Sequence, residues 1–136
     1  MAKFVVMKHQ AKKAGLHFDL RFQKPGKNVY DSFAIRKGVP LEPGNKVVAI
    51  RTTEHTPSEA MFTGEIKIGY GAGTLEIYDT GTVDVIKYHS NHIVLDLHGA
   101  KVNGIYHMIQ FPGMKDRKMF LIFKGKLKGK EVENEL

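Results

Sequence analysis

The chain has 136 residues, a length that fits one domain with a core large enough to fold without covalent staples. It contains no cysteine, which excludes disulfides, thiolate metal sites and cysteine nucleophiles and fits a reducing compartment. Its formal net charge of +7 favours a polyanionic partner, and nucleic acid is the commonest polyanion.

The N-terminus leads directly into a strand-like run and holds no apolar stretch long enough for a signal peptide or a membrane span. We therefore expect a cytoplasmic protein without a membrane partner.

Short strand patterns, separated by turn residues, run through the whole chain. The expected strands are Phe4–Met7, His17–Phe22, Val29–Ile35, Val47–Thr53, Thr74–Tyr78, Thr82–Lys87, Ile93–Leu97, Ile105–Phe111 and Met119–Phe123. The expected turns and loops include Gln10–Gly15, Lys24–Asn28, Pro40–Lys46, Gly69–Gly73 and Asp79–Gly81. One helical turn is expected at Thr56–Ala60, with Thr56 or Ser58 as its cap.

This pattern predicts an all-β fold: a single-domain small β-barrel of short, mostly antiparallel strands with little helix. Residues 1–124 would form the domain. Residues 125–136 are highly charged with few apolar side chains, and we expect a flexible tail there.

Residues 16–22 alternate strictly between apolar and polar side chains. His17, Asp19 and Arg21 fall on one strand face. An imidazole and a carboxylate two residues apart are natural ligands of a divalent metal, and an arginine beside them can hold a phosphate oxygen. His9, a short distance upstream, is a candidate third ligand. The alternation alone also fits an amphipathic strand with a solvated polar face, which is the commoner case.

Further candidates lie where other strands end. Arg51 and His55 alternate on one face of 47–55 and are expected to point the same way. A histidine in such a place can bind a phosphate or act as a general acid. Lys37 follows a strand and can also bind phosphate. For His55 and Lys37, taken singly, a solvated side chain is the commoner interpretation.

Three other features are interpreted as structural. His89 and His92 flank a two-residue turn, which indicates a hairpin rather than a metal pair. His98 and His107 are isolated on strands. The run Gly69–Gly73 predicts a backbone bend, because no helix with a Lys-Ser/Thr pair follows it as in a phosphate-binding loop.

In combination these segments resemble a known family. The segments 4–9 and 16–21 resemble the start of the 3′-phosphoesterase domain of bacterial DNA ligase D. The resemblance continues in order to about Lys124, through 32–38, 43–44, 49–51, His55, Ala60, 62–64, 70–74, 78–81 and 120–124. The chain resembles that domain alone, so we expect a separate DNA ligase and polymerase as partners.

The resemblance implies a manganese-dependent hydrolase, with other divalent transition metals as alternatives. Such an enzyme removes a 3′-terminal ribonucleoside and then the 3′-phosphate from DNA or RNA–DNA primer-template ends, leaving a 3′-hydroxyl for non-homologous end joining. By position, the catalytic residues would be His9, His17, Asp19, Arg21 and His55. The first three would bind the metal. Arg21 and His55 would hold the scissile phosphate, assisted by Lys37 and Arg51.

The sequence departs from the family pattern in three places. The spacing from His9 to His17 is two residues longer, so we expect an enlarged turn. Thr53 stands where the family has an acidic residue, and the neighbouring Glu54 should point to the other face. Glu59 stands where the family has a tyrosine. We expect these changes to weaken phosphate contacts, and removal of the 3′-phosphate more than release of the ribonucleoside.

Two other classes of function stay open on the sequence. One is a nucleic-acid-end-binding module of the same fold with weak catalysis. The other is a cupin-like metalloenzyme acting on a small molecule. Cupin-like sites usually carry a further histidine on a distant strand, and their Gly-x₅-His-x-His spacing is absent here.

Overall fold

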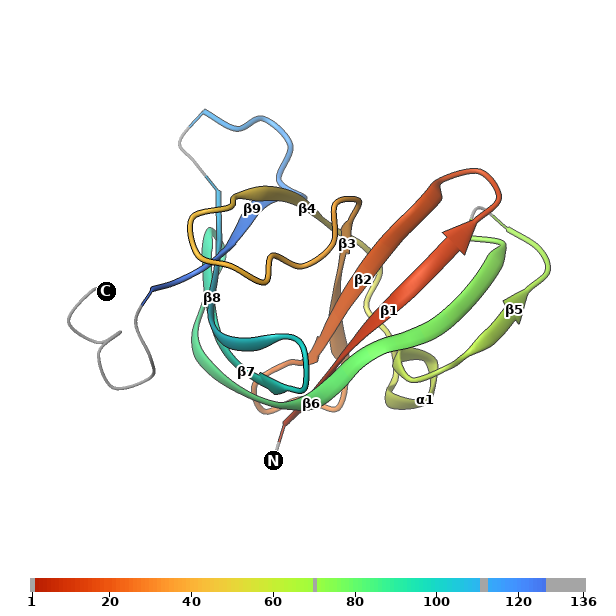
Figure 1. Cartoon of the computed structure of the whole chain (residues 1–136), viewed down its shortest axis with the longest axis horizontal. Coiled ribbons are helices and arrows are strands. Elements are labelled where there is room, and N and C mark those ends of the chain that lie inside the picture. The colour runs from red at the N-terminus through yellow and green to blue at the C-terminus, as the bar shows by residue number, and fades with distance from the viewer. Residues whose placement is uncertain (1, 70, 111–112, 127–136) are drawn as a thin grey trace.

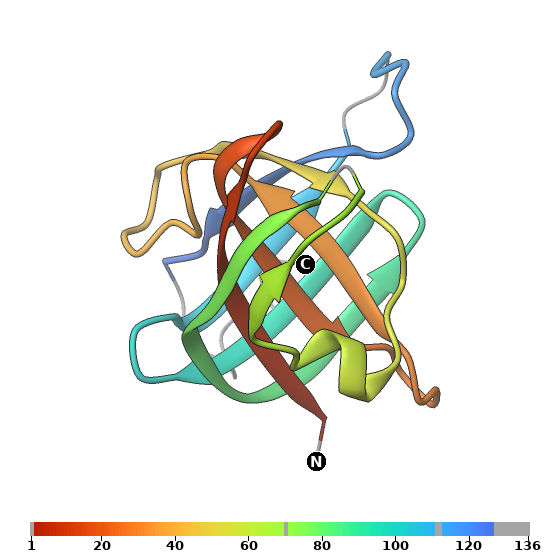
Figure 2. The same cartoon turned by 90° about the vertical axis from the view of Figure 1, so that its right-hand side faces the viewer.

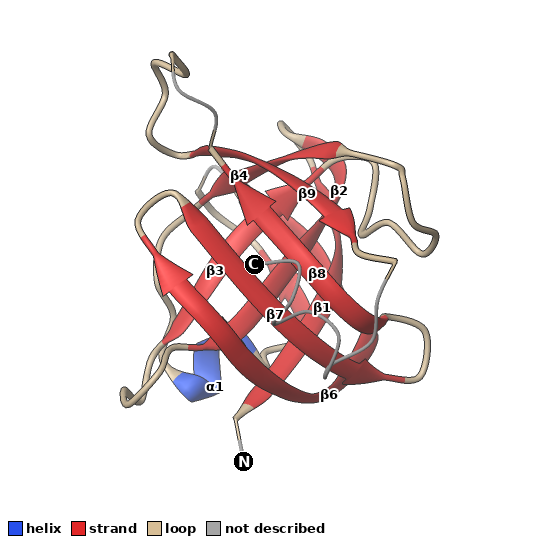
Figure 3. Cartoon of the chain, turned by 90° about the vertical axis from the view of Figure 1, so that its left-hand side faces the viewer, coloured by secondary structure: helices blue, strands red, loops and turns tan. Residues whose placement is uncertain are grey.

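The computed structural model describes residues 2–69, 71–110 and 113–126. Their strands are β1 (Lys3–Ala11), β2 (Gly15–Gln23), β3 (Tyr30–Ile35), β4 (Val47–Arg51), β5 (Gly64–Ile66), β6 (Gly73–His89), β7 (His92–Gly99), β8 (Asn103–Ile109) and β9 (Met119–Lys124) (Figure 1). One short helix, α1 (Pro57–Ala60), separates β4 from β5. The prediction of an all-β chain with little helix is confirmed, as the colouring in Figure 3 makes plain.

The strands form one antiparallel sheet in the order β1-β2-β3-β4-β9-β8-β7-β6-β5. β1 also pairs with β6 over its full length, so the pairings of these eight strands return to their start and close a ring. β5 is added outside the ring on β6. Closing the ring leaves few unpaired strand edges, which protects the sheet against pairing with other chains.

Strand alternation fills the inside of the ring with apolar side chains. Phe33 packs edge-to-face on Phe120 and parallel to Phe22, with ring centroids 5.4 and 6.1 Å apart. The buried members of this core come from every strand of the ring and from the loops before β4 and β8: Phe4, Val6, Leu20, Phe22, Phe33, Ile35, Val39, Val47, Ala49, Val83, Ile93, Leu95, Leu97, Val102, Tyr106, Met108, Phe120 and Ile122.

A second, smaller cluster lies on the outer face of the ring. Val5 and Met7 of β1 pack there with Leu75, under Met61 and Ile66 from the segment that connects β4 to β6. Figure 2 shows this segment, with α1 and β5, in front of β1 and β6. The outer face of β1 and β2 is therefore covered, and polar side chains on it become buried.

The helix α1 begins as expected at Thr56. The Thr56 hydroxyl accepts a hydrogen bond from the Glu59 N–H, and the Glu59 carboxylate accepts one from the Thr56 N–H. This reciprocal pair satisfies donors that a helix start leaves unpaired.

The prediction of two separate strands at 74–78 and 82–87 is wrong, because β6 runs unbroken from Gly73 to His89. Tyr78 is a bulge opposite the Val6–Met7 step of β1, which lets the long strand bend. Gly81 lets β6 pass close to β7, since a Cβ at Gly81 would collide with the His98 carbonyl oxygen. The residues expected to turn the chain therefore bend it without breaking the ladder.

The turn between β1 and β2 is shorter than the expected Gln10–Gly15. β1 continues to Ala11 and β2 begins at Gly15, so residues 12–14 alone connect them. β9 ends at Lys124. From residue 127 onward, the expected tail lies outside the described residues. Within the described parts of the chain, the structure contains no helix of the length and apolarity that a membrane span requires.

Candidate metal centre

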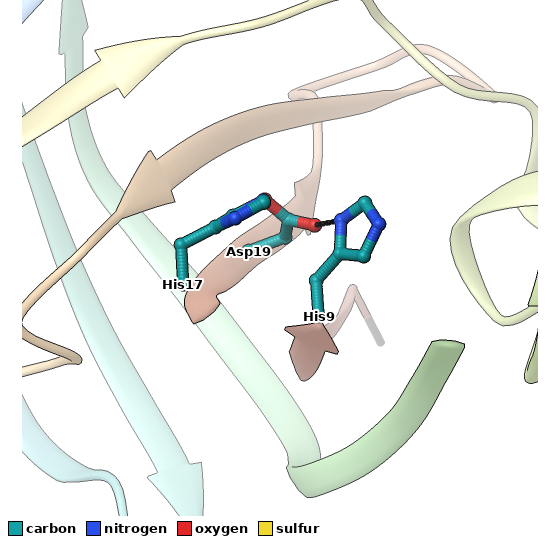
Figure 4. A group of neighbouring side chains, drawn as sticks. All are labelled: His9, His17 and Asp19. Atoms are coloured by element: carbon teal, nitrogen blue, oxygen red, sulfur yellow. Dashed lines mark hydrogen bonds and ion pairs between the residues drawn. The ribbon is translucent and has the colours of Figure 1, made fainter. Parts of the chain in front are cut away.

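The β1–β2 hairpin brings the three predicted ligands together. His9 on β1 and His17 on β2 are direct cross-strand partners, and Asp19 is two residues further along β2 on the same face. Their side chains converge in Figure 4. All three are buried, with 7%, 9% and 5% of their surface exposed, because the covering segment and the cavity walls surround them.

The ligand atoms lie at contact distance. His9 Nδ1 is 3.2 Å from Asp19 Oδ2, and His17 Nε2 is 3.3 Å from Asp19 Oδ1. One atom from each residue can be chosen so that all three lie within 4.8 Å of one another. Donor atoms bound at about 2.1 Å and at right angles to one ion are about 3 Å apart, so this spacing fits a divalent metal ion.

The outer nitrogens of both histidines are held by backbone carbonyls. His9 Nε2 donates to the Gly71 carbonyl oxygen at 2.8 Å, and His17 Nδ1 donates to the Gly15 carbonyl oxygen at 3.3 Å. In a neutral imidazole only one nitrogen carries a proton, so His9 Nδ1 and His17 Nε2 then face the Asp19 carboxylate with lone pairs. Such an arrangement needs a cation between the groups, which either a proton or a metal ion supplies.

The pKa shifts of His17 and Asp19 also indicate that a positive charge is favoured beside the Asp19 carboxylate. The hydrogen bond with Asp19 raises the pKa of His17 above its ordinary value, although burial and the nearby Arg36 charge oppose it. Burial alone would raise the pKa of Asp19, but the His17 bond and the neighbouring positive charges outweigh it and lower that pKa. Asp19 is thus a carboxylate at neutral pH. Two nitrogens and one carboxylate suit manganese, iron or zinc.

Arg21 continues the polar face of β2 beneath α1. Its Nη1 donates to the carbonyl oxygens of Glu59 and Ala60 at 3.3 and 3.1 Å, and Nη2 lies 3.5 Å from Asp19 Oδ2. The side chain is 5% exposed, and its Nε is buried with no hydrogen-bond partner among the described residues. An unsatisfied donor beside the metal ligands fits an oxygen-rich ligand such as a phosphate.

His55 reaches the same cavity from the loop that follows β4. Its backbone exchanges two hydrogen bonds with Tyr30, at 3.0 and 2.8 Å, which fixes its position. Burial and the positive charge of Arg21 lower the pKa of His55, so the imidazole is neutral at neutral pH. A neutral imidazole can donate one hydrogen bond to a phosphate, whereas a role as general acid requires a proton that this environment disfavours.

These side chains line one cavity of about 880 Å³. It contains His9, His17, Asp19, Arg21, Lys37 and His55 from the predicted set. Arg36 and Lys46 also line it and were missed by the sequence reasoning. Arg36 directly follows β3 and precedes Lys37, so its place at the end of a strand was the available signal.

The structure does not bring Arg51 to this cavity. Its Nε and Nη2 donate to the two carboxylate oxygens of Asp31 at 3.2 and 3.0 Å. The guanidinium also stacks over the rings of Phe33 and Phe120, at 5.0 and 5.1 Å from their centroids. Asp31, which is 1% exposed, accepts a further bond from the Tyr88 hydroxyl. Arg51 therefore neutralises a buried carboxylate, and phosphate binding by Arg51 finds no support in this arrangement.

The departures from the family pattern have distinct positions. Thr53 lines the cavity. Glu54 forms an ion pair with Lys24 and does not line the cavity, as its expected orientation implies. The Glu59 carboxylate is bound to the Thr56 N–H at the start of α1, and its backbone carbonyl is the acceptor for Arg21. Glu59 thus acts on the site through its carbonyl and its charge.

Two other histidine groups lie elsewhere. His89 and His92 pair across the β6–β7 turn, so the predicted hairpin is confirmed. His92 Nε2 is 3.3 Å from His107 Nδ1. On the exposed side of β6 and β7, His98 forms ion pairs with Asp84 and Asp96 at 3.3 and 3.5 Å. Unlike the His9 cluster, this group is open to solvent and outside the cavity.

Comparison with known proteins gives one family. The family described as the DNA ligase D 3′-phosphoesterase domain matches residues 7–110. The multifunctional non-homologous end joining protein LigD of Mycolicibacterium smegmatis is 35% identical over 135 residues, covering 85% of this chain and 17% of that protein.

Two further relatives agree. The multifunctional non-homologous end joining DNA repair protein LigD of Mycobacterium tuberculosis is 33% identical over 132 residues, covering 86% of this chain and 17% of that protein. The LigD protein of Pseudomonas aeruginosa is 31% identical over 116 residues, covering 81% and 13%. The chain thus spans less than a fifth of the length of each of these relatives.

Proposed function

This chain belongs to the family of DNA ligase D 3′-phosphoesterase domains, and from that premise we propose that it is a metal-dependent phosphoesterase that processes the 3′ ends of DNA. It releases a 3′-terminal ribonucleoside and then hydrolyses the 3′-phosphate, which leaves a 3′-hydroxyl. The manganese ion is the proposed cofactor, and DNA ligase and polymerase activities are the proposed users of the repaired end.

The observation that carries this proposal is that the donor atoms of His9, His17 and Asp19 converge on one point. His9 Nε2 and His17 Nδ1 each donate a hydrogen bond to a backbone carbonyl. The lone pairs of His9 Nδ1 and His17 Nε2 therefore meet those of the Asp19 carboxylate at the buried end of a cavity lined by positively charged side chains. A metal ion held there would neutralise phosphate charge and lower the pKa of a bound water.

The chain's own residues supply the remaining chemistry. Arg21 orients Asp19 and offers its unpaired Nε to a non-bridging phosphate oxygen, where negative charge develops during hydrolysis. His55, which lines the same cavity, donates a hydrogen bond to the same phosphate. Lys37, at the more open part of the cavity, adds long-range attraction for the substrate anion. Hydrolysis breaks the phosphorus–oxygen bond to the leaving group, and water supplies the new oxygen and the proton.

The test uses a recessed primer that ends in one ribonucleotide, incubated with and without manganese. We expect a shortened strand in the presence of manganese, first with a 3′-phosphate and later with a 3′-hydroxyl. Binding of the primer without cleavage under any divalent metal would instead support a nucleic-acid-end-binding module.

A further inference from the structure

The cavity extends well beyond the three metal ligands. From the metal end it continues over the outer face of β3 and β4, where Ala34, Val48 and Ile50 form part of its lining. Ala34 and Ile50 are direct cross-strand partners, and Val48 lies two residues from Ile50 on the same face. Val48 is 44% exposed, so this surface is apolar and open to a ligand.

Positive side chains border this apolar surface. Arg36 directly follows β3, which ends at Ile35, and its exposed side chain lines the same cavity as Val48. Lys46, two residues before Val48, also lines the cavity and sits 5.1 Å from the centroid of Phe123. Within the described ranges, the Arg36 side chain takes part in no hydrogen bond or ion pair, so its charge is available to a ligand.

The charge balance of the cavity selects an anion with an apolar part. Asp19 is the single acidic residue among the described residues that line it, and its two carboxylate oxygens are already in contact with His9, His17 and Arg21. Arg36, Lys37 and Lys46 line the same cavity as His17 and Asp19 and make its lining positively charged. A nucleotide combines a phosphate with the apolar faces of a sugar and a base.

We propose that the shelf formed by Ala34, Ile50, Val48, Arg36 and Lys46 binds the nucleotide immediately 5′ of the scissile phosphate. This rests on the proposed function. A strand cut near its 3′ end continues only on the 5′ side of the scissile phosphate, so the next nucleotide has to leave the cavity along a neighbouring surface. The apolar side chains contact its sugar and base, and Arg36 holds its own 5′-phosphate bidentately. Lys46 attracts the phosphate that follows.

The test uses two short substrates with the same 3′-terminal ribonucleotide. In one, the preceding nucleotide ends in a free 5′-hydroxyl, and in the other it carries a 5′-phosphate. For the unaltered protein we expect the added phosphate to lower KM about tenfold, the usual scale of one charge-assisted bidentate contact. In Arg36→Ala most of this gain disappears. Arg117→Ala, which removes an exposed arginine outside the cavity, keeps it.

The apolar part has its own matched pair of variants. Val48→Asp places a negative charge on the shelf and raises KM for both substrates. Ile77→Asp makes a similar change at a residue that is 47% exposed and outside the cavity, and leaves KM unchanged. Because both side chains are exposed, neither change removes core packing, and circular dichroism of each variant checks the fold.

A binding measurement separates the shelf from catalysis. With an uncleavable oligonucleotide, Arg36→Ala should reduce the slope of log K against log salt by about 0.7, the value for one phosphate of a single strand. An undiminished phosphate gain in Arg36→Ala, with cleavage intact in the unaltered protein, overturns the shelf alone. Absence of cleavage in the unaltered protein with every divalent metal overturns the proposed function itself.

Discussion

His9 and His17 lie directly opposite each other across the β1–β2 hairpin, with ring centroids 4.5 Å apart. The ladder continues beyond this pair through Gln10↔Leu16 and Ala11↔Gly15, so the turn that was expected to be enlarged is confined to residues 12–14. Because a shift of one residue would turn a side chain to the other face, this register decides whether the proposed metal ligands meet.

Replacement of Asp19 by Ala should abolish manganese-stimulated cleavage and weaken manganese binding, because the two remaining imidazoles lose the negative ligand between them. The free-manganese signal in electron paramagnetic resonance titrations measures binding without reference to activity. His92→Ala is the control, since His92 begins β7 at the β6–β7 hairpin and lies outside the cavity. Loss of binding in His92→Ala with retention in Asp19→Ala would show that the ligands are misassigned.

Arg21→Lys should reduce turnover about 100-fold, because an ammonium group cannot contact Asp19, the α1 carbonyls and a phosphate together. The same change should lower the free energy of unfolding by about 1–3 kcal/mol, since buried carbonyls lose their donor. Lys37→Ala should be milder, near tenfold in KM. Steady-state kinetics and urea unfolding measure the two effects, and unchanged turnover in Arg21→Ala would refute the phosphate role.

Cleavage of a ribonucleotide-ended primer should yield 3′-phosphate ends that persist. The position where the family has a tyrosine holds Glu59, so a hydroxyl donor is missing for the more highly charged phosphomonoester. The Glu59 carboxylate is bound to the Thr56 N–H, so the lost donor matters more here than direct repulsion. A timed digest on a sequencing gel resolves both products. Prompt 3′-hydroxyl ends without a 3′-phosphate intermediate would count against this expectation.

Gly73→Ala should weaken manganese binding about tenfold, although Gly73 is not a ligand. A Cβ at Gly73 would collide with the Gln10 carbonyl oxygen and separate β6 from β1. That displacement moves the Gly71 carbonyl, which orients His9, and loss of such an orienting bond usually costs 10–100-fold in metal affinity. Gly44→Ala is the matched control, because Gly44 also has a positive φ, of 90°, but an added Cβ meets nothing within 4 Å. Equal manganese affinities in the two variants would contradict this role for the glycine turn.

Asp79 should make stability depend on pH at acidic values. Burial would raise the pKa of Asp79, but the N–H groups of Val102, Lys101, Thr80 and Ala100 outweigh it and lower that pKa below its ordinary value. A carboxyl whose folded-state pKa is depressed stabilises the fold above its unfolded pKa of about 3.9, and this contribution is lost as the pH falls through the folded-state value.

Asp79→Asn should therefore lower the free energy of unfolding by about 2 kcal/mol at pH 6, where the charged acceptor is present. At pH values below the folded-state pKa, the difference between the two proteins should shrink. Urea unfolding across this range measures it. A difference that stays constant from pH 6 to pH 2 would show that the carboxylate charge plays no part.

The sequence by itself determined the all-β class, the alternating face of His17, Asp19 and Arg21, and the start of α1 at Thr56. These features depend on periods of two and on local capping, which neighbouring residues decide. It also predicted the hairpin between His89 and His92, because a two-residue turn between alternating strands is a local signal.

Only the tertiary structure decided which polar residues meet. Arg51 shares an alternating pattern with His55, yet it turns to the buried carboxylate of Asp31, a partner that is distant in sequence. The turn in which the Ala72 N–H donates to the Gly69 carbonyl was predictable, but the contact of Gly71 with His9 depends on the β1–β6 pairing that closes the ring. Arg36 becomes part of the cavity because β3, which it follows, pairs with β2 on one side and with β4 on the other. Such contacts join segments far apart in the chain, and no local pattern specifies them.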